Sequence, residues 1–319
     1  MTRSSRVLHL DAGPSFRGGQ GQVLLLARGQ VQDTSSPSMV VRVLARNHEL
    51  LGRLEAAGVP CTAWAGPASP RGLFTLRQAI RDFRPDILHA HDSRALGAFR
   101  LLAPTELQTR TVVHRRIDDP PRRSRATRWK YSQARVISVS SAVDRAMADF
   151  GIPQQRRRVV YSAVDELPSR PPRRQPPEAG RPLRLLSIGA LVPHKGHRHL
   201  LDALARTQRP HHLTLLGEGP LERTLQAQAQ ALHLQARLKI EQVPEDLNSS
   251  FAEADLFVHP SVTEGLGTAV LDAMARGLPV LASRCGGLPE LVNSSSGWLV
   301  SPGKPDELRE MLDWISSFA

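Results

Sequence analysis

The sequence predicts an α/β protein built from two doubly wound parallel-sheet domains. Short apolar runs alternate with segments of helical periodicity along almost the whole chain, which is typical of parallel sheets covered on both faces by helices. The 319 residues suffice for two such domains, each with a core of its own. Residues 166–182 repeat Pro and Arg and hold few apolar side chains, so we expect them to link a domain over 1–165 to a second domain over 183–319.

The first domain is predicted to begin with a buried strand and to alternate strands with helices. Its predicted strands cover 6–10, 39–44, 59–64, 111–114, 136–139 and 159–161, with a further strand ending at His89–His91, and its predicted helices cover 49–57, 74–83 and 140–150. The second domain repeats the pattern, with strands predicted over 183–189, 213–217, 238–243, 281–287 and 297–300, and helices over 197–206 and 305–317.

Residues 259–280, HPSVTEGLGTAVLDAMARGLPV, predict a strand end, a loop with two glycines and a helix. Thr268 is the predicted N-cap of this helix and Gly277 ends it. A helix start presents free N–H groups and the positive end of the helix dipole, so the loop suits a phosphate. Glu264 in the loop and Asp272 in the helix place carboxylates for sugar and ribose hydroxyls. The alternative is an ordinary turn with solvated acids.

Two further loops follow predicted strands and carry residues suited to a ligand. Gly18 and Gly19 lie in a glycine loop that leads into a helix, and such a loop lets the backbone approach a ligand closely; an ordinary glycine-rich turn is the alternative. Lys195, followed by Gly196, comes after the first strand of the second domain. It is one of four lysines in an Arg-rich chain, which favours a specific role for its point charge.

His89 and His91 lie two residues apart at a strand end and therefore share one face of the sheet. A metal site is one interpretation, but no third ligand with matching spacing is apparent, so no metal site is predicted. His89 is predicted to be a structural histidine with satisfied hydrogen bonds. His91 leaves the strand at the edge of the sheet where ligands gather in open α/β folds, so it is predicted to be functional.

Together these motifs resemble those of the retaining nucleotide-sugar glycosyltransferases of family four, which have the GT-B fold. Glu264 and Asp272 match the family's E-x7-E region, and the loops at Gly18–Gly19, His91 and Lys195–Gly196 follow in the order that the family requires. Two positions depart from the family pattern. Asp272 stands in place of the second Glu, and Ala190 stands where many members carry the Arg of an R-x4-K pair.

The resemblance implies two Rossmann-like domains that face each other across a cleft, and transfer of a sugar from a nucleotide diphosphate with retention. Lys195 would then hold the diphosphate, Glu264 the sugar and Asp272 the ribose, and His91 would act near the sugar and the acceptor. The catalytic residues expected on this basis are His91, Glu264 and Lys195. The donor-binding residues expected with them are Gly18, Gly19, Lys195, Glu264, Gly265, Leu266, Gly267, Thr268 and Asp272. The family needs neither a metal nor another cofactor.

Two other functions stay open from the sequence. A sugar-nucleotide epimerase would share the scaffold and lack a separate acceptor. A catalytically weakened protein that only binds nucleotide sugars is suggested by Ala190 and Asp272. The sugar, the base and the acceptor are not specified by any motif.

The positive charge is concentrated in the first half of the chain. Residues 1–170 hold 27 basic and 14 acidic side chains, whereas residues 171–319 hold 15 and 16. A basic run between Arg110 and Arg135, with Arg115 and Arg116 nearest the preceding strand, suits a phosphate-bearing lipid-linked or glycan acceptor, or an anionic membrane; a solvated arginine face is the alternative. Nucleic acid is not expected, because the aromatic content is 4% and no recognition motif occurs. With no signal sequence or spanning segment apparent, the expected location is the cytoplasm, including the cytoplasmic face of the inner membrane.

Overall fold

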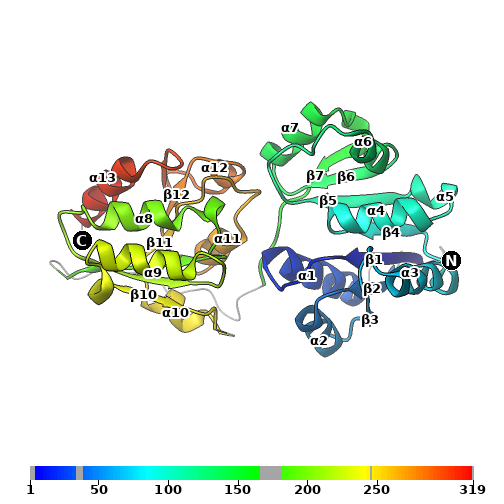
Figure 1. The fold of residues 1–319 in the computed structure, drawn as a ribbon, viewed down its shortest axis with the longest axis horizontal. Coiled ribbons are helices and arrows are strands. Elements are labelled where there is room, and N and C mark those ends of the chain that lie inside the picture. The colour runs from blue at the N-terminus through cyan, green and yellow to red at the C-terminus, as the bar shows by residue number, and fades with distance from the viewer. Residues whose placement is uncertain (1–3, 34–38, 166–180, 245, 318–319) are drawn as a thin grey trace. The chain divides into compact units, whose positions relative to one another are not determined.

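The computed structural model describes residues 4–33, 39–165, 181–244 and 246–317. The chain forms two compact units, Met1–Ala163 and Val164–Ala319. Each unit contains one parallel sheet with helices packed on it (Figure 1), so the prediction of two parallel-sheet α/β domains is confirmed. Most of the predicted linker, 166–180, lies outside the described residues.

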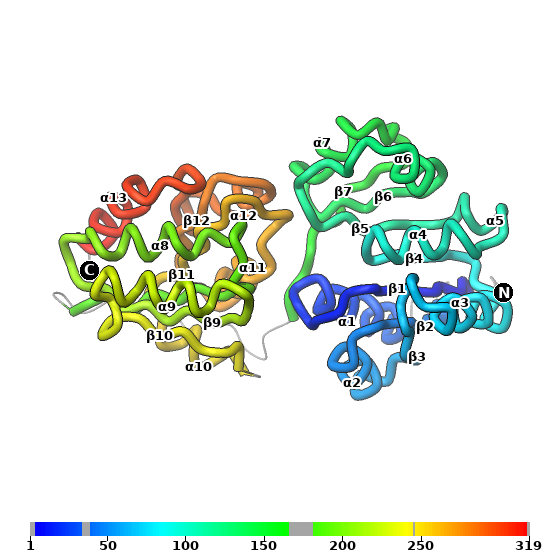
Figure 2. The backbone as a smooth tube through the Cα atoms, viewed as in Figure 1, coloured from blue at the N-terminus to red at the C-terminus, as the bar shows by residue number. Residues whose placement is uncertain are grey.

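The sheet of the first unit has seven strands in the order β3-β2-β1-β4-β5-β6-β7, and every neighbouring pair is parallel. The strand order reverses between β1 and β4, which lie side by side in the middle of the sheet (Figure 2). Ligands of open α/β folds bind beyond the carboxyl ends of the strands at such a reversal. The strands are β1 (Ser5–Asp11), β2 (Met39–Ala45), β3 (Cys61–Ala63), β4 (Ile87–Ala90), β5 (Thr111–Arg115), β6 (Arg135–Ser138) and β7 (Arg157–Val159).

Helices cover both faces of this sheet. Adjacent residues of β2 show why: Leu44 joins one buried cluster with Leu76 and Phe99, whereas Val43 joins another with Val23 and Leu50. Successive side chains of a strand point to opposite faces, so an apolar strand needs a helical layer on each side. The helices are α1 (Gly18–Gln32), α2 (His48–Ala56), α3 (Pro70–Phe83), α4 (Ser93–Leu102), α5 (Thr105–Gln108), α6 (Arg125–Tyr131), α7 (Ser141–Phe150) and the short η1 (Gln154–Arg156).

The side chain of Asp92 fixes the start of α4 and joins it to the end of β1. Its Oδ1 accepts hydrogen bonds from the backbone N–H groups of Arg94 (2.7 Å) and Ala95 (3.0 Å), which is the usual role of an N-cap residue. Its Oδ2 accepts from the N–H of Ala12 at 2.7 Å. One carboxylate therefore holds the two segments on either side of the strand reversal.

The sheet of the second unit has six parallel strands in the order β10-β9-β8-β11-β12-β13, with its reversal between β8 and β11. Leu185 and Leu186 of β8 belong to different buried clusters, so this sheet is also covered on both faces. The strands are β8 (Leu183–Ile188), β9 (His211–Leu216), β10 (Leu238–Glu241), β11 (Leu256–His259), β12 (Val280–Ser283) and β13 (Gly297–Val300). The helices are η2 (Pro193–Lys195), α8 (His197–Leu204), α9 (Glu222–Ala231), η3 (Gln235–Arg237), α10 (Asn248–Glu253), α11 (Thr268–Ala275), α12 (Leu288–Leu291) and α13 (Pro305–Ser316).

The differences from the predicted elements are mostly at their ends. The strand predicted over 159–161 is Arg157–Val159, and the strand predicted over 281–287 ends at Ser283, where a glycine turn and α12 take over. The prediction that Thr268 is an N-cap is wrong: Gly267 occupies that position and Thr268 is the first helical residue. Within the described residues, no helix combines the length and the apolar character needed to cross a membrane.

Two helical glycines of the first unit give a matched test of its packing. A Cβ on Gly72 in α3 would lie 2.0 Å from the carbonyl oxygen of Gly66, so Gly72→Ala is expected to lower the free energy of unfolding by about 2 kcal/mol or more. Gly52 in α2 has nothing within 4 Å of the same position, so Gly52→Ala is expected to be neutral or to stabilise by up to about 1 kcal/mol. Urea unfolding of both variants checks this, and equal midpoints would contradict it.

Candidate active site

In the second unit, the loops that follow β8 and β11 meet at the strand reversal. Gly196 has a φ of +69° and a Cβ there would lie 2.0 Å from the carbonyl oxygen of Pro260, so only glycine fits. The N–H of Val262 donates to the carbonyl of His194 at 2.7 Å. These contacts hold the turn that carries Lys195 against the loop that carries Glu264.

One carboxylate oxygen of Glu264 is the centre of this site. Its Oε2 lies 2.5 Å from Lys195 Nζ, 2.8 Å from His259 Nε2 and 3.2 Å from Ser261 Oγ. The side chains of Lys195 and Glu264 are 18% and 13% exposed, so the ion pair is largely shielded from solvent. Two residues that the sequence predicted as separate ligand contacts are thus bonded to each other.

The neighbours of Glu264 keep it ionised. Burial alone would raise the pKa of this carboxyl group, but the hydrogen bond from His259 and the charge of Lys195 outweigh burial and hold the pKa far below its usual range. Burial lowers the pKa of His259, so its ring is neutral at pH 7 and uses Nε2–H as a donor. His259 was not among the predicted site residues, although it ends the strand that leads into the Glu264 loop.

The helix start after this loop is shaped by Gly267. Its φ is +96°, and a Cβ would lie 2.7 Å from Leu288 Cδ2. Gly267 has no side chain to cap the start of α11, and the first turn of the helix holds no acidic residue. Leu266 is buried and anchors the loop in the core. The predicted backbone site at Gly265–Thr268 is therefore a helix start, where the positive end of the helix dipole lies.

Asp272 makes a different contact from those of Glu264. Its Oδ1 accepts a hydrogen bond from Arg276 Nη1 at 3.1 Å, four residues later along the chain. Burial raises the pKa of this carboxyl group, and the guanidinium of Arg276 opposes that effect. Arg276 in turn lies over the ring of Phe251, with 4.6 Å between the guanidinium carbon and the ring centroid.

His197 adds an imidazole beside Lys195 that the sequence analysis did not single out. A Cβ on Gly189 would lie 3.7 Å from Lys195 Cδ and 3.9 Å from His197 Nε2, so both side chains flank the end of β8 next to Ala190. Burial, followed by the positive potential of His259 and Lys195, lowers the pKa of His197 to about 3. The ring is therefore neutral.

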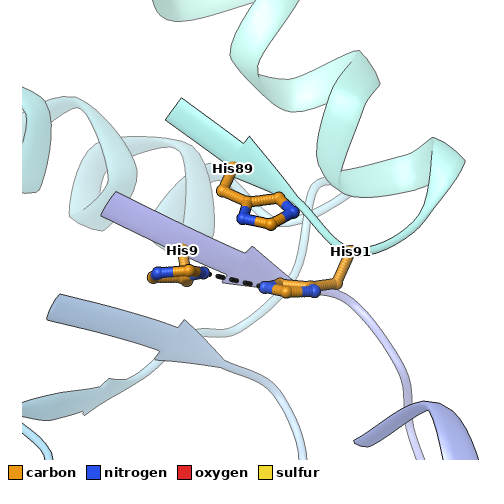
Figure 3. A group of neighbouring side chains, drawn as sticks. All are labelled: His9, His89 and His91. Carbon is orange, nitrogen blue, oxygen red and sulfur yellow. Dashed lines mark hydrogen bonds between the residues drawn. The ribbon is translucent and has the colours of Figure 1, made fainter. Parts of the chain in front are cut away.

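In the first unit, His91 belongs to a stack of buried imidazoles (Figure 3). His91 Nε2 lies 2.9 Å from His9 Nδ1, and His89 Nε2 lies 3.0 Å from His114 Nδ1. His9 joins His89 and His91 as a third imidazole that the local sequence spacing did not indicate. His9 on β1 is the direct neighbour of His89 on β4, a strand pairing that the sequence does not reveal. His89 is buried and its Nε2 has a hydrogen-bond partner in His114, as expected for a core histidine.

Arg116 connects this stack to the start of α1. Gly18 and Gly19, which were predicted to lie in a loop, are the first two residues of this helix. Its Nη1 donates to the carbonyl oxygen of His91 at 3.0 Å, and its Nη2 lies 3.4 Å from His91 Nδ1. A Cβ on Gly19 would lie 3.7 Å from Arg116 Cδ, so Gly18, Gly19, His91 and Arg116 share one site. Burial lowers the pKa of Arg116 to about 10, which leaves the guanidinium charged at pH 7.

These contacts fix the proton positions on His91. Arg116 has only donors, so His91 Nδ1 accepts and His91 Nε2 carries the proton that it donates to His9. Burial, followed by the neighbouring charges, lowers the pKa of His91 well below its usual value. His91 is thus neutral, and both of its ring nitrogens have partners.

The rest of the basic run divides into bonded and exposed arginines. Arg115 Nη2 donates to the carbonyl of Asp119, and Arg123 Nη2 donates to the carbonyl of Asp149 at 2.7 Å. Arg122, Arg125 and Arg128 are exposed. The predicted anion site at Arg115 and Arg116 therefore separates into a half-buried arginine at the end of β5, which is bonded to Asp119, and a half-buried arginine beside His91.

Two family models match the chain and together span most of it. The model described as "Glycosyl transferases group 1" matches residues 170–317, and that described as "Glycosyltransferase Family 4" matches residues 18–166. The chain belongs to the family 4 glycosyltransferases. The resemblance drawn from the sequence motifs is thereby confirmed, and with it the assignment to the glycosyltransferase class of enzymes.

Named relatives of this glycosyltransferase include mannosyltransferases. It is 30% identical over 288 residues to the MMP alpha-(1->4)-mannosyltransferase of Mycolicibacterium hassiacum, covering 79% of this chain and 67% of that protein. It is 34% identical over 132 residues to a GDP-mannose-dependent monoacylated alpha-(1-6)-phosphatidylinositol monomannoside mannosyltransferase of Corynebacterium glutamicum, covering 38% of this chain and 35% of that protein. The chain thus spans about a third of the second relative.

Solved structures confirm the two-domain GT-B type of fold. The crystal structure of Anabaena HepE in complex with UDP-glucose has a TM-score of 0.81 with this glycosyltransferase and is 21% identical in sequence. The match covers 98% of this chain and 93% of HepE. At this identity the likeness concerns the fold alone.

The buried imidazoles predict that the first unit loses stability as the pH falls from about 7 to 5. An unfolded histidine takes up a proton near pH 6.5, whereas folded His9 and His114 do so only near pH 4 and 3. The unfolded state therefore binds more protons in this range, and each such histidine lowers the free energy of unfolding by about 1.4 kcal/mol per pH unit. The loss begins near the unfolded pKa and is complete below the folded one.

Urea unfolding at several pH values measures this slope. Replacing His9 with Leu is expected to reduce the slope by the contribution of one proton, whereas His212→Asn, at an exposed position, is expected to leave it unchanged. A free energy of unfolding that stays constant between about pH 7 and pH 5 would contradict the neutral state of the stack.

Proposed function

We propose that this chain is a retaining glycosyltransferase that moves a sugar from a nucleotide diphosphate to an envelope-type glycan or lipid-linked acceptor. The observation that carries the proposal is the contact of Lys195, His259 and Ser261 with one oxygen of Glu264, at the strand reversal of a family 4 fold. Lys195 offers a cation for a diphosphate, and beside it Glu264 offers an ionised carboxylate for sugar hydroxyls. The second unit is proposed to bind the donor and the first unit the acceptor.

Donor binding would change the partner of Lys195. A diphosphate carries more negative charge than Glu264 and competes for the same ammonium group. His259 and Ser261 still donate to Glu264 when Lys195 turns away, so the carboxylate keeps its position and its charge. It then accepts hydrogen bonds from hydroxyls of the sugar. The ion pair between Lys195 and Glu264 is thus replaced by one between Lys195 and the diphosphate when the donor binds.

The departing diphosphate would be stabilised by Lys195 and by the backbone N–H groups at Gly267 and Thr268. Preorganised charges and helix starts of this kind lower the free energy of a transition state in which negative charge develops on the leaving group. Because Ala190 supplies no charge where many family members have Arg, Lys195 bears a larger share of this stabilisation. We propose that transfer uses no metal ion or other cofactor.

The remaining predicted residues are assigned supporting roles. Asp272 is proposed to contact ribose hydroxyls, directly or through a water molecule, with Arg276 holding its carboxylate. Both nitrogens of His91 are engaged, so we assign the acceptor proton to the leaving phosphate on the same face of the sugar. His91 then positions the sugar and the acceptor through its backbone and through Arg116, next to Gly18 and Gly19. Arg115 and Arg116 are proposed to bind an anionic group of the acceptor.

The names of the relatives favour transfer over the two alternatives. Both curated relatives described above are named mannosyltransferases, and neither name points to an epimerase or a binding protein. GDP-mannose and UDP-glucose occur in the names of similar proteins, so these two donors are the first to test. Incubation with a labelled donor and an acceptor is expected to transfer the labelled sugar to the acceptor, and Glu264→Gln is expected to abolish this transfer. Transfer of this kind distinguishes a glycosyltransferase from an epimerase and from a protein that only binds the donor.

Replacing Lys195 tests the diphosphate assignment. Lys195→Met is expected to weaken the binding of a nucleoside diphosphate about tenfold or more, since a charge-assisted hydrogen bond contributes roughly 1.5–3 kcal/mol. Binding of the matching nucleoside should change little. Lys239→Met, at an exposed lysine of β10, is the control. Calorimetry that gives equal losses for the diphosphate and the nucleoside would refute the assignment.

The exposed arginines around α6 are proposed to hold the enzyme at an anionic membrane, close to a lipid-linked acceptor. Each basic residue near such a surface contributes about 1 kcal/mol, and Ile117 and Trp129 expose apolar side chains in the same segment. Charge reversal of Arg122, Arg125 and Arg128 to Glu is expected to abolish co-sedimentation with anionic liposomes at low salt. Reversal of Arg71, Arg77 and Arg81, which are exposed on α3, is the matched control. If both variants sediment equally, or if the native protein binds neutral and anionic liposomes equally, these arginines only face solvent and do not bind a membrane.

A further inference from the structure

Three imidazoles of the first unit come together, and the proposed transfer reaction uses only one of them, His91, through its backbone and through Arg116. His9, His89 and His91 each offer a ring nitrogen, and these atoms lie within 4.8 Å of one another (Figure 3). All three side chains are buried, with 0%, 5% and 4% of their surface exposed. The ring centroids of His89 and His91 are 4.4 Å apart, and those of His9 and His89 are 4.9 Å apart.

We propose that His9, His89 and His91 bind a late first-row divalent metal ion such as Zn²⁺. Imidazole nitrogens are favoured ligands of such ions, and three of them with one open position form a common zinc coordination set. The inference is independent of the donor site in the second unit.

The hydrogen bond between His9 and His91 is close to the required geometry. Two nitrogens of a tetrahedral zinc site, each about 2.0–2.1 Å from the metal, lie about 3.3 Å apart. His9 Nδ1 and His91 Nε2 are already 2.9 Å apart. The metal takes the place of the His91 Nε2 proton, which moves to Nδ1. This loses the 3.4 Å contact with Arg116 Nη2 and keeps the 3.0 Å bond from Nη1 to the His91 carbonyl oxygen.

His89 supplies the third nitrogen with an oriented ring. Its Nε2 lies 3.0 Å from His114 Nδ1, which leaves His89 Nδ1 outside that hydrogen bond. When His89 donates through Nε2–H, its Nδ1 lone pair is free for a metal, and His114 acts as the outer partner that zinc-bound histidines usually have. The three nitrogens need to close by about 1.5 Å, which rotations of the rings about Cβ–Cγ can supply.

The charge nearest the stack is the guanidinium of Arg116 beside His91. The carboxylates of Asp11 and Asp92 both interact with that guanidinium and offset its positive charge at the carboxyl ends of β1 and β4. A metal there would join β1 to the residue after β4 and would fix His91 in the stack, which is a structural role.

The test uses the 319-residue chain without a tag, after treatment with a chelator. Titration with Co²⁺ is expected to give visible d–d absorption bands that saturate at one equivalent, and Zn²⁺ is expected to displace the Co²⁺. His9→Asn and His89→Asn should each weaken binding at least about tenfold, the scale on which changes around metal sites act. His212→Asn, at an exposed histidine, is the matched control and should bind as the native protein does.

Three results would overturn the proposal. The folded native protein could give no d–d absorption bands with Co²⁺, both ligand variants could bind Co²⁺ as tightly as the native protein, or His212→Asn could lose binding. If the ligand variants do not fold, the native protein alone decides the matter. A melting temperature that rises with Zn²⁺ and not with Mg²⁺, together with the Co²⁺ bands, supports the site, and a melting temperature insensitive to Zn²⁺ refutes it.

Discussion

The ion pair between Lys195 and Glu264 is the interaction on which the proposed donor site depends. It joins a turn after β8 to a loop after β11, two segments that are adjacent only because the strand order reverses between them. Burial of a carboxylate is unfavourable unless donors compensate it, and Lys195, His259 and Ser261 together do so. The same arrangement places an ionised acceptor and a cation side by side at the proposed site of the nucleotide sugar.

The sequence predicted the features that local patterns encode. Strand and helix order, the second-unit loops and the motif residues Gly19, His91, Lys195 and Glu264 all follow from periodicity, glycine placement and family motifs. The structure brings these residues together in two groups, one in each unit. Element ends were less accurate: Thr268 looked like an N-cap, but the backbone needs a φ of +96° at the cap position, and only Gly267 adopts that without strain.

What the sequence could not reveal depends on pairing between distant strands. His9 is 82 residues away from its hydrogen-bond partner His91, and only the register of β1 against β4 brings them together. Charge counting has a similar limit. The excess of arginine in the first half predicted an anionic partner, but Arg116 and Arg123 are engaged with protein carbonyl groups. The basic run therefore presents fewer free guanidinium groups than its composition suggests.

The close approach of Gly196 to Pro260 has a consequence for redesigning donor preference. A Cβ on Gly196 would lie only 2.0 Å from the carbonyl oxygen of Pro260, so the two loops are in direct backbone contact. Neither loop can therefore be rebuilt without the other. Inserting residues after β8 would displace the loop after β11, and shortening either one would separate Lys195 from Glu264. A change of sugar specificity is therefore better sought by replacing side chains around this contact while the two backbones stay unchanged, or by exchanging both loops together.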